Sequence, residues 1–271
     1  MTSVSSSADI RLGDCLDILK TIPDGTVDAV IDDLPYGVLN LGNDNAKWDE
    51  QIPMDELWTQ FLRVAKPNAA IVMFAQGMFT AQLMMSRPKL WRYNIIWDKC
   101  RASGFLNANR MPLRSHEDIC VFYRELPTYN PQMVEVDDSH KSHSRGRLDK
   151  EIKNSCYGNF KLTQENITNL KYPKSIISIP REGPSLLVHP TQKPVELLRW
   201  LIRTYTNKGE TVLDATMGSG TTGVAAMLED RNFIGVEKTE KYFNIAQQRI
   251  DVAAKSRDID RKIPKQTNFI W

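Results

Sequence analysis

The sequence predicts an α/β fold built on a doubly wound, mostly parallel sheet. Apolar runs that suit buried strands alternate with amphipathic segments at helical spacing over residues 27–87, and again over residues 194–255. In the second half a strand, TVLDAT, leads through a glycine turn into a helix start. A chain of 271 residues, 41% of them hydrophobic, is long enough to bury the core of such a sheet.

The first half of the chain supplies the elements up to residue 124. Residues 1–8 are polar and are expected to be a disordered lead-in. Two runs rich in β-branched and aromatic residues, YNIIWDK and HEDICVFYR, are separated by a polar connection, which favours an antiparallel hairpin at the edge of the sheet. The elements expected in order are a helix over 11–23, a strand over 27–33, a helix over 54–66, a strand over 69–77, a helix over 79–87, and strands over 93–99 and 116–124.

Residues 125–185 lack periodicity and are rich in Pro, Asn, Ser and charge, so they are interpreted as an inserted segment. Regular elements return in residues 186–255, where Pro194 suits the first position of a helix. The tail, residues 256–271, is polar. The expected elements are a helix over 194–206, a strand over 211–216, a glycine turn over 217–223, a helix over 224–230, a strand over 233–237 and a helix over 241–255.

Composition excludes few functions. The net charge of +2 argues neither for nor against nucleic acid. Four cysteines without a CxxC pair, and an HxxH at His140 and His143 without further ligands, predict no metal site. No run approaches the ~18–20 apolar residues of a membrane span, and the N-terminus has no signal-type segment, so a cytoplasmic protein without a membrane partner is expected. Residues 141–153, KSHSRGRLDKEIK, hold six basic side chains, counting the histidine, against two acidic ones. A solvated loop and a phosphate-binding surface are both consistent with that run.

The glycine turn MGSGTTG has two possible ligands. Gly218, Gly220 and Gly223 form GxGxxG, and Glu237 follows at the end of the next strand, which formally matches a dinucleotide site. Asp214, however, would meet a pyrophosphate with its negative charge. S-adenosylmethionine avoids that conflict, because its amino group and sulfonium favour carboxylates while its own carboxylate suits helix N-terminal amides.

A second feature is IDDLPYG, residues 31–37, where two carboxylates and a Pro-Tyr pair end an apolar strand. Charge at the end of a buried strand is costly unless something uses it. If strand geometry persists, Asp32 and Asp33 point to opposite faces, and Asp33 is in register with the Pro-Tyr pair. A simple turn, with Asp33 capping and Tyr36 in the core, is the alternative.

DLPYG at 33–37, DATMGSGTT at 214–222 and HPTQKPVELL at 189–198 together resemble the motifs of the amino-group DNA methyltransferases. GDCLDIL at 13–19 and RSHEDICVF at 114–122 resemble further family segments, so that the resemblance covers residues 9–252 except the insert. Catalytic motif first, insert second and cofactor motif last is the circularly permuted order of the β class. The implied fold is a Rossmann-like methyltransferase fold, with residues 9–124 as its catalytic half, 125–185 as the target-recognition region and 186–255 as its cofactor half.

The resemblance implies specific roles for the catalytic motif. The Asp33 carboxylate and the Leu34 backbone carbonyl accept the two hydrogens of an exocyclic amine, Pro35 keeps Leu34 extended, and Tyr36 stacks on a base turned out of the duplex. Leu34 replaces the usual first proline, which leaves a backbone acceptor in place. Asp in the first position is typical of enzymes that methylate adenine at N-6, and cytosine N-4 remains the alternative.

The resemblance also implies a cofactor site for S-adenosylmethionine. Ala215-Thr216 replace the usual Pro-Phe, so an aromatic partner for the adenine ring must come from elsewhere, with Trp200 and Phe233 as candidates. Thr191 and Lys193 are expected to bind the methionine carboxylate beside the helix that starts at Pro194. The expected cofactor residues are Asp14, Cys15, Thr191, Lys193, Asp214, Gly218, Ser219, Gly220, Thr221, Thr222 and Glu237.

The expected partner is double-stranded DNA, bound in part by the basic run through Lys141, Arg145, Arg147, Lys150 and Lys153. By resemblance the chain is expected to act in the cytoplasm, associated with the nucleoid, in a prokaryote or a phage, and to form a homodimer. Three alternatives remain: methylation of RNA or of a glutamine side chain, a non-catalytic DNA-binding protein with this fold, and a nicotinamide-dependent dehydrogenase.

Overall fold

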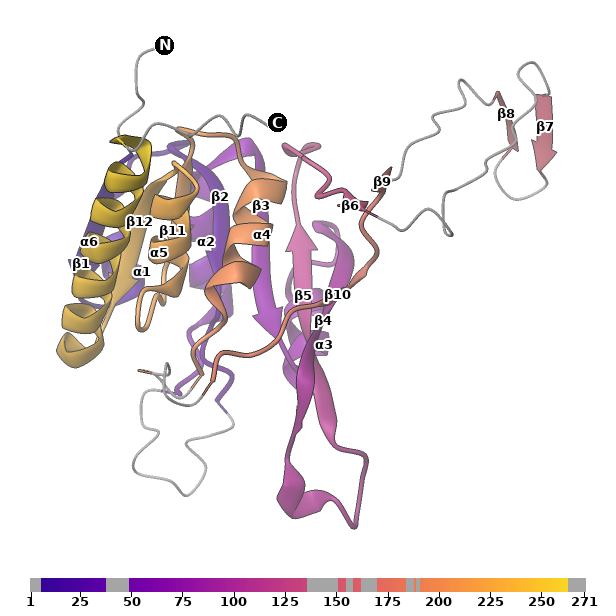
Figure 1. Cartoon of the computed structure of the whole chain (residues 1–271), viewed down its shortest axis with the longest axis horizontal. Coiled ribbons are helices and arrows are strands. Elements are labelled where there is room, and N and C mark those ends of the chain that lie inside the picture. The colour runs from indigo at the N-terminus through magenta and orange to yellow at the C-terminus, as the bar shows by residue number, and fades with distance from the viewer. Residues whose placement is uncertain are drawn as a thin grey trace, which may run out of the picture. The chain divides into compact units, whose positions relative to one another are not determined.

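The computed structural model describes residues 6–37, 49–135, 151–154, 158–161, 170–183, 188 and 191–262. The chain divides into two compact units, residues 1–130 with 175–271 and residues 131–174. The first unit contains an eight-stranded sheet, shown in Figure 1. In spatial order its strands are β1 (Ala8–Leu12), β12 (Asn232–Glu237), β11 (Thr211–Asp214), β2 (Val27–Asp32), β3 (Ala65–Ala75), β5 (Arg114–Phe122), β4 (Trp91–Ser103) and β10 (Ile176–Ser178).

The sheet is mostly parallel, as predicted. Only β5 runs against its neighbours β3 and β4, and every other pairing in this sheet is parallel. The strands from the first part of the chain and those from its last part meet where β11 pairs with β2, with Leu213 opposite Val30. Residues far apart in the chain, such as Asp214 and Asp32, therefore end at the same edge of the sheet. That edge is the place where ligands bind in doubly wound sheets.

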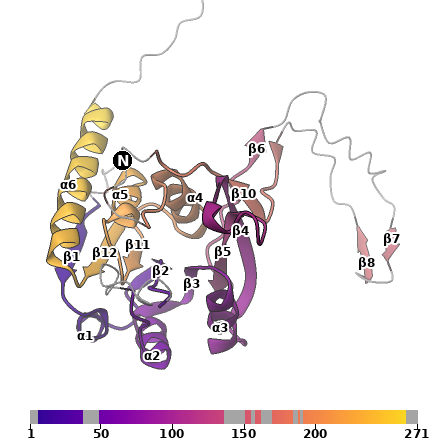
Figure 2. The ribbon, with the colours of Figure 1, turned by 90° about the horizontal axis from the view of Figure 1, so that it is seen from below.

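Helices cover both faces of the sheet (Figure 2). The first three, α1 (Cys15–Leu19), α2 (Met54–Val64) and α3 (Met78–Ser86), pack with Val30, Met73 and Phe122 in one buried cluster. The last three, α4 (Val195–Tyr205), α5 (Thr221–Leu228) and α6 (Glu240–Lys262), pack with Ile31 and Phe74 in the other. Alternate residues of one strand thus face different layers, because strand side chains alternate across a sheet.

Several elements differ from the sequence-based expectation, among them α6, which continues to Lys262 beyond the helix expected over 241–255. The strand β1 lies in residues expected to be a lead-in and a helix, and the fold is already paired at Ser7, whose carbonyl accepts the Phe233 amide at 2.9 Å. The helix expected over 11–23 is limited to α1. The β4–β5 hairpin lies one strand in from the edge, because β10, inside the expected insert, pairs with β4 and forms the edge itself.

The second unit contains two short antiparallel pairs. The strand β6 (Val134–Glu135) pairs with β9 (Leu170–Lys171), and β7 (Glu151–Asn154) pairs with β8 (Gly158–Lys161). Among the described residues, no helix combines the length and the apolar character that a membrane crossing requires.

Candidate active site at the carboxyl edge of the sheet

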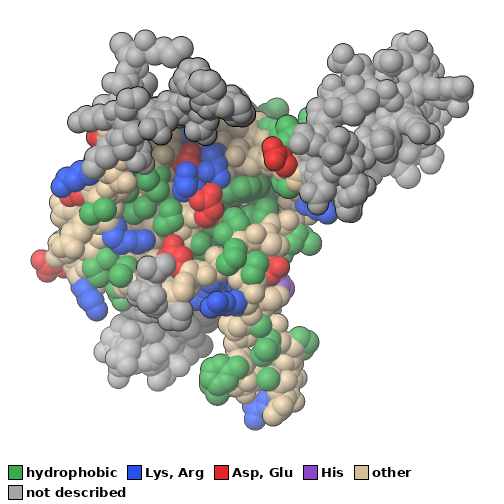
Figure 3. Space-filling model, in the orientation of Figure 1, with side chains coloured by type: hydrophobic (Ala, Val, Ile, Leu, Met, Phe, Trp, Pro, Cys, Tyr) green, Lys and Arg blue, Asp and Glu red, His purple; other side chains and the backbone are tan. Residues whose placement is uncertain are grey.

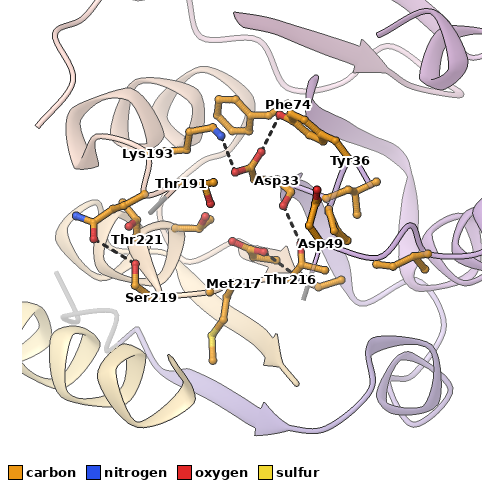
Figure 4. Close-up of a pocket in the computed structure, with 18 of the residues that line it drawn as sticks. Asp33, Tyr36, Asp49, Phe74, Thr191, Lys193, Thr216, Met217, Ser219 and Thr221 are labelled. Atoms are coloured by element: carbon orange, nitrogen blue, oxygen red, sulfur yellow. Dashed lines mark hydrogen bonds and ion pairs between the residues drawn. The ribbon is translucent and has the colours of Figure 1, made fainter. Parts of the chain in front are cut away.

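A cavity of about 1290 Å³ opens at the edge where β2, β11 and β12 end (Figure 4). The cavity lies wholly within the first unit. Residues from both predicted motifs line it, together with residues of the segment that precedes α4. The predicted site residues that line the cavity are Asp14, Cys15, Asp33, Leu34, Pro35, Tyr36, Thr191, Lys193, Asp214, Gly218, Ser219, Thr221, Thr222 and Glu237.

The loop that carries the predicted catalytic motif begins where β2 ends. Asp33 is engaged at both carboxylate oxygens: Oδ1 accepts the Tyr36 hydroxyl at 3.0 Å, and Oδ2 lies 2.5 Å from Lys193 Nζ. The Tyr36 ring is stacked on Phe79, with centroids 4.7 Å apart and planes 25° from parallel. Burial raises the pKa of Asp33, and the Lys193 ammonium opposes that rise. The carboxylate is therefore held in one orientation and aimed into the cavity.

Leu34, the residue that replaces a proline of the family motif, is buried in the cluster with α1, α2 and α3. Its side chain adds apolar surface to the core. Its backbone carbonyl is unchanged in kind, because every residue carries that acceptor. The turn that follows requires Gly37, whose φ is +71° and whose amide donates to Asp49 Oδ1 at 3.0 Å.

Asp32 has a different partner from Asp33, as the alternation of strand side chains predicts. It is buried and accepts the Ala215 amide at 3.0 Å and the Thr216 hydroxyl. The same Thr216 hydroxyl lies 3.1 Å from the Asp33 carbonyl oxygen. Ala215 and Thr216, which depart from the family motif, thus connect the glycine turn directly to the loop after β2.

The turn between β11 and α5 requires glycine, because its backbone has positive φ and packs closely against α6. Gly218 has φ +51° and Gly220 has φ +76°, and a Cβ on Gly220 would lie 2.7 Å from the Ala246 side chain of α6. The turn is also held by Arg249, which donates to the Ser219 carbonyl at 2.6 Å and to the Thr221 hydroxyl at 3.2 Å. Gly220 and Gly223 therefore serve close packing, since the cavity is not lined by either of them.

Carboxylates gather around the cavity floor. Burial raises the pKa of Asp214, which lines the cavity, well above its ordinary value, and it raises the pKa of Asp32, which does not line the cavity, to about 6. Burial also raises the pKa of Glu237, whose Oε1 accepts the Thr239 amide at 2.6 Å. A cationic ligand would reverse the shifts of these carboxylates, because a nearby positive charge favours the ionised form. The cavity floor is thus suited to a cation.

Asp14 and Cys15 lie where β1 passes into α1. Asp14 caps that helix by accepting the Leu16 amide at 2.9 Å, and the Gly13 amide donates to the Glu237 carbonyl at 2.9 Å. Burial raises the pKa of the Cys15 thiol to about 12, so the thiol stays protonated and unreactive. Cys15 contributes apolar lining at this position.

The segment before α4 has partners within the chain itself. The Val195 amide, at the start of α4, donates to Glu182 Oε1 at 3.0 Å, so a carboxylate of the chain itself already occupies that helix end. Lys193 points instead to Asp33 and to Glu117, 3.3 Å away. Thr191 and Gln192 remain on the cofactor side, where Gln192 Oε1 accepts the Ser219 hydroxyl at 3.3 Å.

Two residues of this site, the buried Lys99 and the half-buried Glu117, escaped the sequence analysis. Glu117 on β5 lies 3.3 Å from Lys99 Nζ on β4, and both line the cavity. The detectable signal was a glutamate beside an apolar run, HEDICVF, although no spacing in the sequence links it to Lys193. The aromatic candidates Trp200 and Phe233 were wrong, because Phe233 is buried beneath the glycine turn and neither residue lines the cavity.

The predicted DNA contacts are largely outside the described residues. Lys141, Arg145, Arg147 and Lys150 lie outside them, and so does His189. For Lys153, which lies in β7, only the backbone is described.

A different surface lies beside the cavity. The tip of the β4–β5 hairpin exposes apolar side chains (Figure 3). Residues 99–115 carry Lys99, Arg101, Arg110 and Arg114 and no acidic residue, and the exposed apolar residues are Phe105, Leu106, Met111 and Leu113.

Comparison with known proteins agrees with this geometry. The model of the N6_N4_Mtase family, described as DNA methylase, matches residues 27–248. The DNA adenine methyltransferase YhdJ of Escherichia coli K12 is 27% identical over 251 residues, which cover 89% of this chain and 82% of that protein. Two crystal structures have the same fold. The M1.HpyAVI–SAM complex has a TM-score of 0.61 at 24% identity and covers 90% of this chain and 99% of its own. The cytosine-N4-specific PvuII DNA methyltransferase has a TM-score of 0.62 at 16% identity, with coverage of 94% and 93%.

Proposed function

Because the chain belongs to the N6_N4_Mtase family of DNA methylases, we propose that it transfers a methyl group from S-adenosylmethionine to the N-6 amine of adenine in duplex DNA. The observation that carries the proposal is the direct contact between the two motifs. The Thr216 hydroxyl of the cofactor turn meets the Asp33 carbonyl of the catalytic loop at 3.1 Å. A methyl donor on the turn and an amine on the loop would therefore face each other across one cavity.

An exocyclic amine of a base is a poor nucleophile because its lone pair is delocalised into the ring. Acceptors that hold both amine hydrogens favour a tetrahedral nitrogen and return the lone pair to it. Asp33 offers a carboxylate oxygen, and Leu34 offers a backbone carbonyl next to it. The proton released after transfer would pass to the Asp33 carboxylate, whose raised pKa makes it a stronger base than an exposed aspartate.

The residues around the cavity floor suit S-adenosylmethionine. Asp214 lines the cavity and is a buried carboxylate whose raised pKa a sulfonium or an ammonium would lower. Glu237 ends β12 at the position where an acid binds a ribose diol. When bound, the cofactor supplies an electrophilic methyl group, and the chain's own contribution is to orient it and to exclude water.

A target base must leave the duplex, because its amine is not accessible to an enclosed site while it is paired. Tyr36, already stacked on Phe79, is placed to stack on such a base with its other face. The hairpin with Arg101, Arg110 and Arg114 offers positive charge next to the cavity for the DNA backbone. The run Lys141–Lys153 remains a further predicted contact.

The experiment is transfer of tritiated methyl groups from S-adenosylmethionine to amplified, unmethylated duplex DNA, with RNA and protein as comparison substrates. The product DNA is then digested to nucleosides and analysed by mass spectrometry. We expect the methylated nucleoside to be N6-methyl-2′-deoxyadenosine. Label in RNA or protein alone, or no label with intact cofactor binding, would contradict the proposal.

Cytosine N-4 transfer is the second candidate. It is supported by the structural likeness to the cytosine-N4-specific PvuII enzyme, and an amine on cytosine would need the same two acceptors. Asp33 at the first motif position favours adenine, by the resemblance described above. The nucleoside analysis separates the two, since N4-methylcytosine would appear in place of N6-methyladenine.

A further inference from the structure

Four charged side chains form a connected row beside the cavity. Lys99 Nζ lies 3.3 Å from Glu117 Oε1, Glu117 Oε2 lies 3.3 Å from Lys193 Nζ, and Lys193 Nζ lies 2.5 Å from Asp33 Oδ2. The row holds two positive and two negative charges and is therefore neutral. It joins β4, β5, the segment before α4 and the loop after β2, which meet only in the folded chain.

The row is mostly buried in the wall of the cavity. The side chain of Lys99 is 4% exposed, that of Lys193 10% and that of Glu117 16%. The Lys193 ammonium also lies 4.9 Å from the centre of the Phe74 ring. Apolar residues of similar volume often stabilise a fold as well as buried ion pairs do. Stability alone thus gives no reason to keep four charges here.

The contacts of Glu117 are uneven. Its Oε1 accepts a hydrogen bond from Lys99, whereas its Oε2 is buried and makes no hydrogen bond within the described part of the chain, only the ionic contact with Lys193. The contact of Glu117 with the ammonium is thus longer, at 3.3 Å, than the 2.5 Å contact between the ammonium and Asp33. The hydrogen bond of Lys193 goes to Asp33.

We infer that Glu117 is a positioning residue for the methyl transfer: it holds Lys193 against Oδ2 of Asp33, with Lys99 balancing its charge. Lys193 then fixes one oxygen of Asp33 and leaves Oδ1, now bound by the Tyr36 hydroxyl, as the oxygen that meets the amine. The inference rests on the proposed function for its kinetic test. Its second test, a crystal structure of a Glu117 variant, does not depend on that function.

Two explanations of a Glu117 variant predict opposite shifts in the pKa of Asp33. Lys193 lowers the pKa of Asp33 more than the charge of Glu117 raises it. If Glu117 positions Lys193, its loss releases the ammonium and the pKa of Asp33 rises. If Glu117 acts only through its field, its loss lowers that pKa. Within the described part of the chain, Tyr36, Asp32 and Asp214 are further ionisable groups that interact with Asp33 or Glu117.

The experiment compares Glu117→Gln with the wild type in single-turnover methyl transfer to amplified duplex DNA between pH 5 and 9. Because Glu117→Gln alone would leave Lys99 as an uncompensated buried charge, the double variant Glu117→Gln/Lys99→Met keeps the row neutral. Glu125→Gln, at an exposed glutamate just beyond β5, is the matched control.

We expect both Glu117 variants to lose about 10- to 100-fold in the transfer rate, with the acidic limb of the profile moved to higher pH. Affinity for S-adenosylmethionine in a calorimeter should stay near the wild-type value, and Glu125→Gln should behave as wild type. An acidic limb moved to lower pH, or an unchanged rate and profile in the folded double variant, would overturn the inference.

A crystal structure of the double variant provides the second readout, which needs no activity. We expect Lys193 Nζ to lie beyond hydrogen-bond distance of Asp33 there. Lys193 still bonded to Asp33 would refute the positioning role even if the rate had fallen. Absence of methyl transfer by the wild type would contradict the proposed function alone, and this structural comparison would still decide the role of Glu117.

Discussion

Replacing Thr216 by valine tests the contact between the two motifs. The substitution keeps the shape of the side chain and removes only the hydroxyl, which lies within hydrogen-bond reach of the Asp32 carboxylate and the Asp33 carbonyl. A hydroxyl carries one proton, so the two acceptors share it. Loss of a hydrogen bond to a charged group costs about 1.5–3 kcal/mol. Because Thr216 is half-buried, water replaces part of that bond, and we expect the variant to be about 2 kcal/mol less stable.

The consequence of Thr216→Val for catalysis follows from the same contact. Asp33 and Leu34 lose their anchor to the cofactor turn, and a small displacement of acceptors is expected to slow transfer by about tenfold or more. Chemical denaturation measures the stability, and single-turnover methyl transfer measures the rate. Thr59→Val is the matched control, because the Thr59 hydroxyl donates to the Asp55 carbonyl on the exposed face of α2. Wild-type stability and rate in Thr216→Val would refute the reasoning.

The other predictions concern the acceptor, the cofactor floor and the turn. Asp33→Ala should abolish methyl transfer yet retain S-adenosylmethionine binding in a calorimeter, and loss of binding would assign Asp33 to the cofactor instead. Cofactor affinity should fall as the pH drops, because burial raises the pKa of Asp214, which lines the cavity, and a protonated Asp214 no longer attracts a cationic ligand; titrations at pH 5.5 and 8 check this, and equal affinities would contradict it. Gly220→Ala should destabilise the fold in thermal melts by about 2 kcal/mol or more, because the residue has positive φ and its Cβ would lie 2.7 Å from α6. Gly25→Ala, at φ +62° with nothing near its Cβ, isolates the backbone strain and should cost about 1 kcal/mol. Equal melting points for the two glycine variants would exclude the contact with α6 as the cause.

Much of the fold could be predicted because its central strands are strongly patterned. The strands β2, β11 and β12 are buried on both faces and therefore appear in the sequence as continuous apolar runs. The strand β1 is different: its residues ADIRL are exposed or half-buried at the sheet edge, and no apolar pattern marks them. The three residues of β10 are too few to show a period at all, so the edge of the sheet was assigned to the hairpin instead.

Some residues of the site could likewise be predicted from the sequence, and others could not. Asp33, Tyr36 and Asp214 lie within short contiguous motifs, which place them without knowledge of the fold. The contact of Lys193 with Glu117 depends on β5 lying antiparallel between β3 and β4. Local residue spacing in the sequence does not predict that strand order. The occupied N-terminus of α4 depends on Glu182, whose position relative to the helix is likewise set by the chain path.

The hydroxyl of Tyr36 donates to Asp33 Oδ1 before any base arrives, so an incoming base must exchange one donor for another. An amine brings hydrogens and can replace the phenol without leaving the buried carboxylate short of a partner. A carbonyl oxygen, which guanine and thymine present where adenine and cytosine carry the amine, brings lone pairs alone. It would displace the donor and supply none, at the cost of an unsatisfied buried charge. Asp33 Oδ1 would therefore select bases that donate a hydrogen bond to it, before methyl transfer begins.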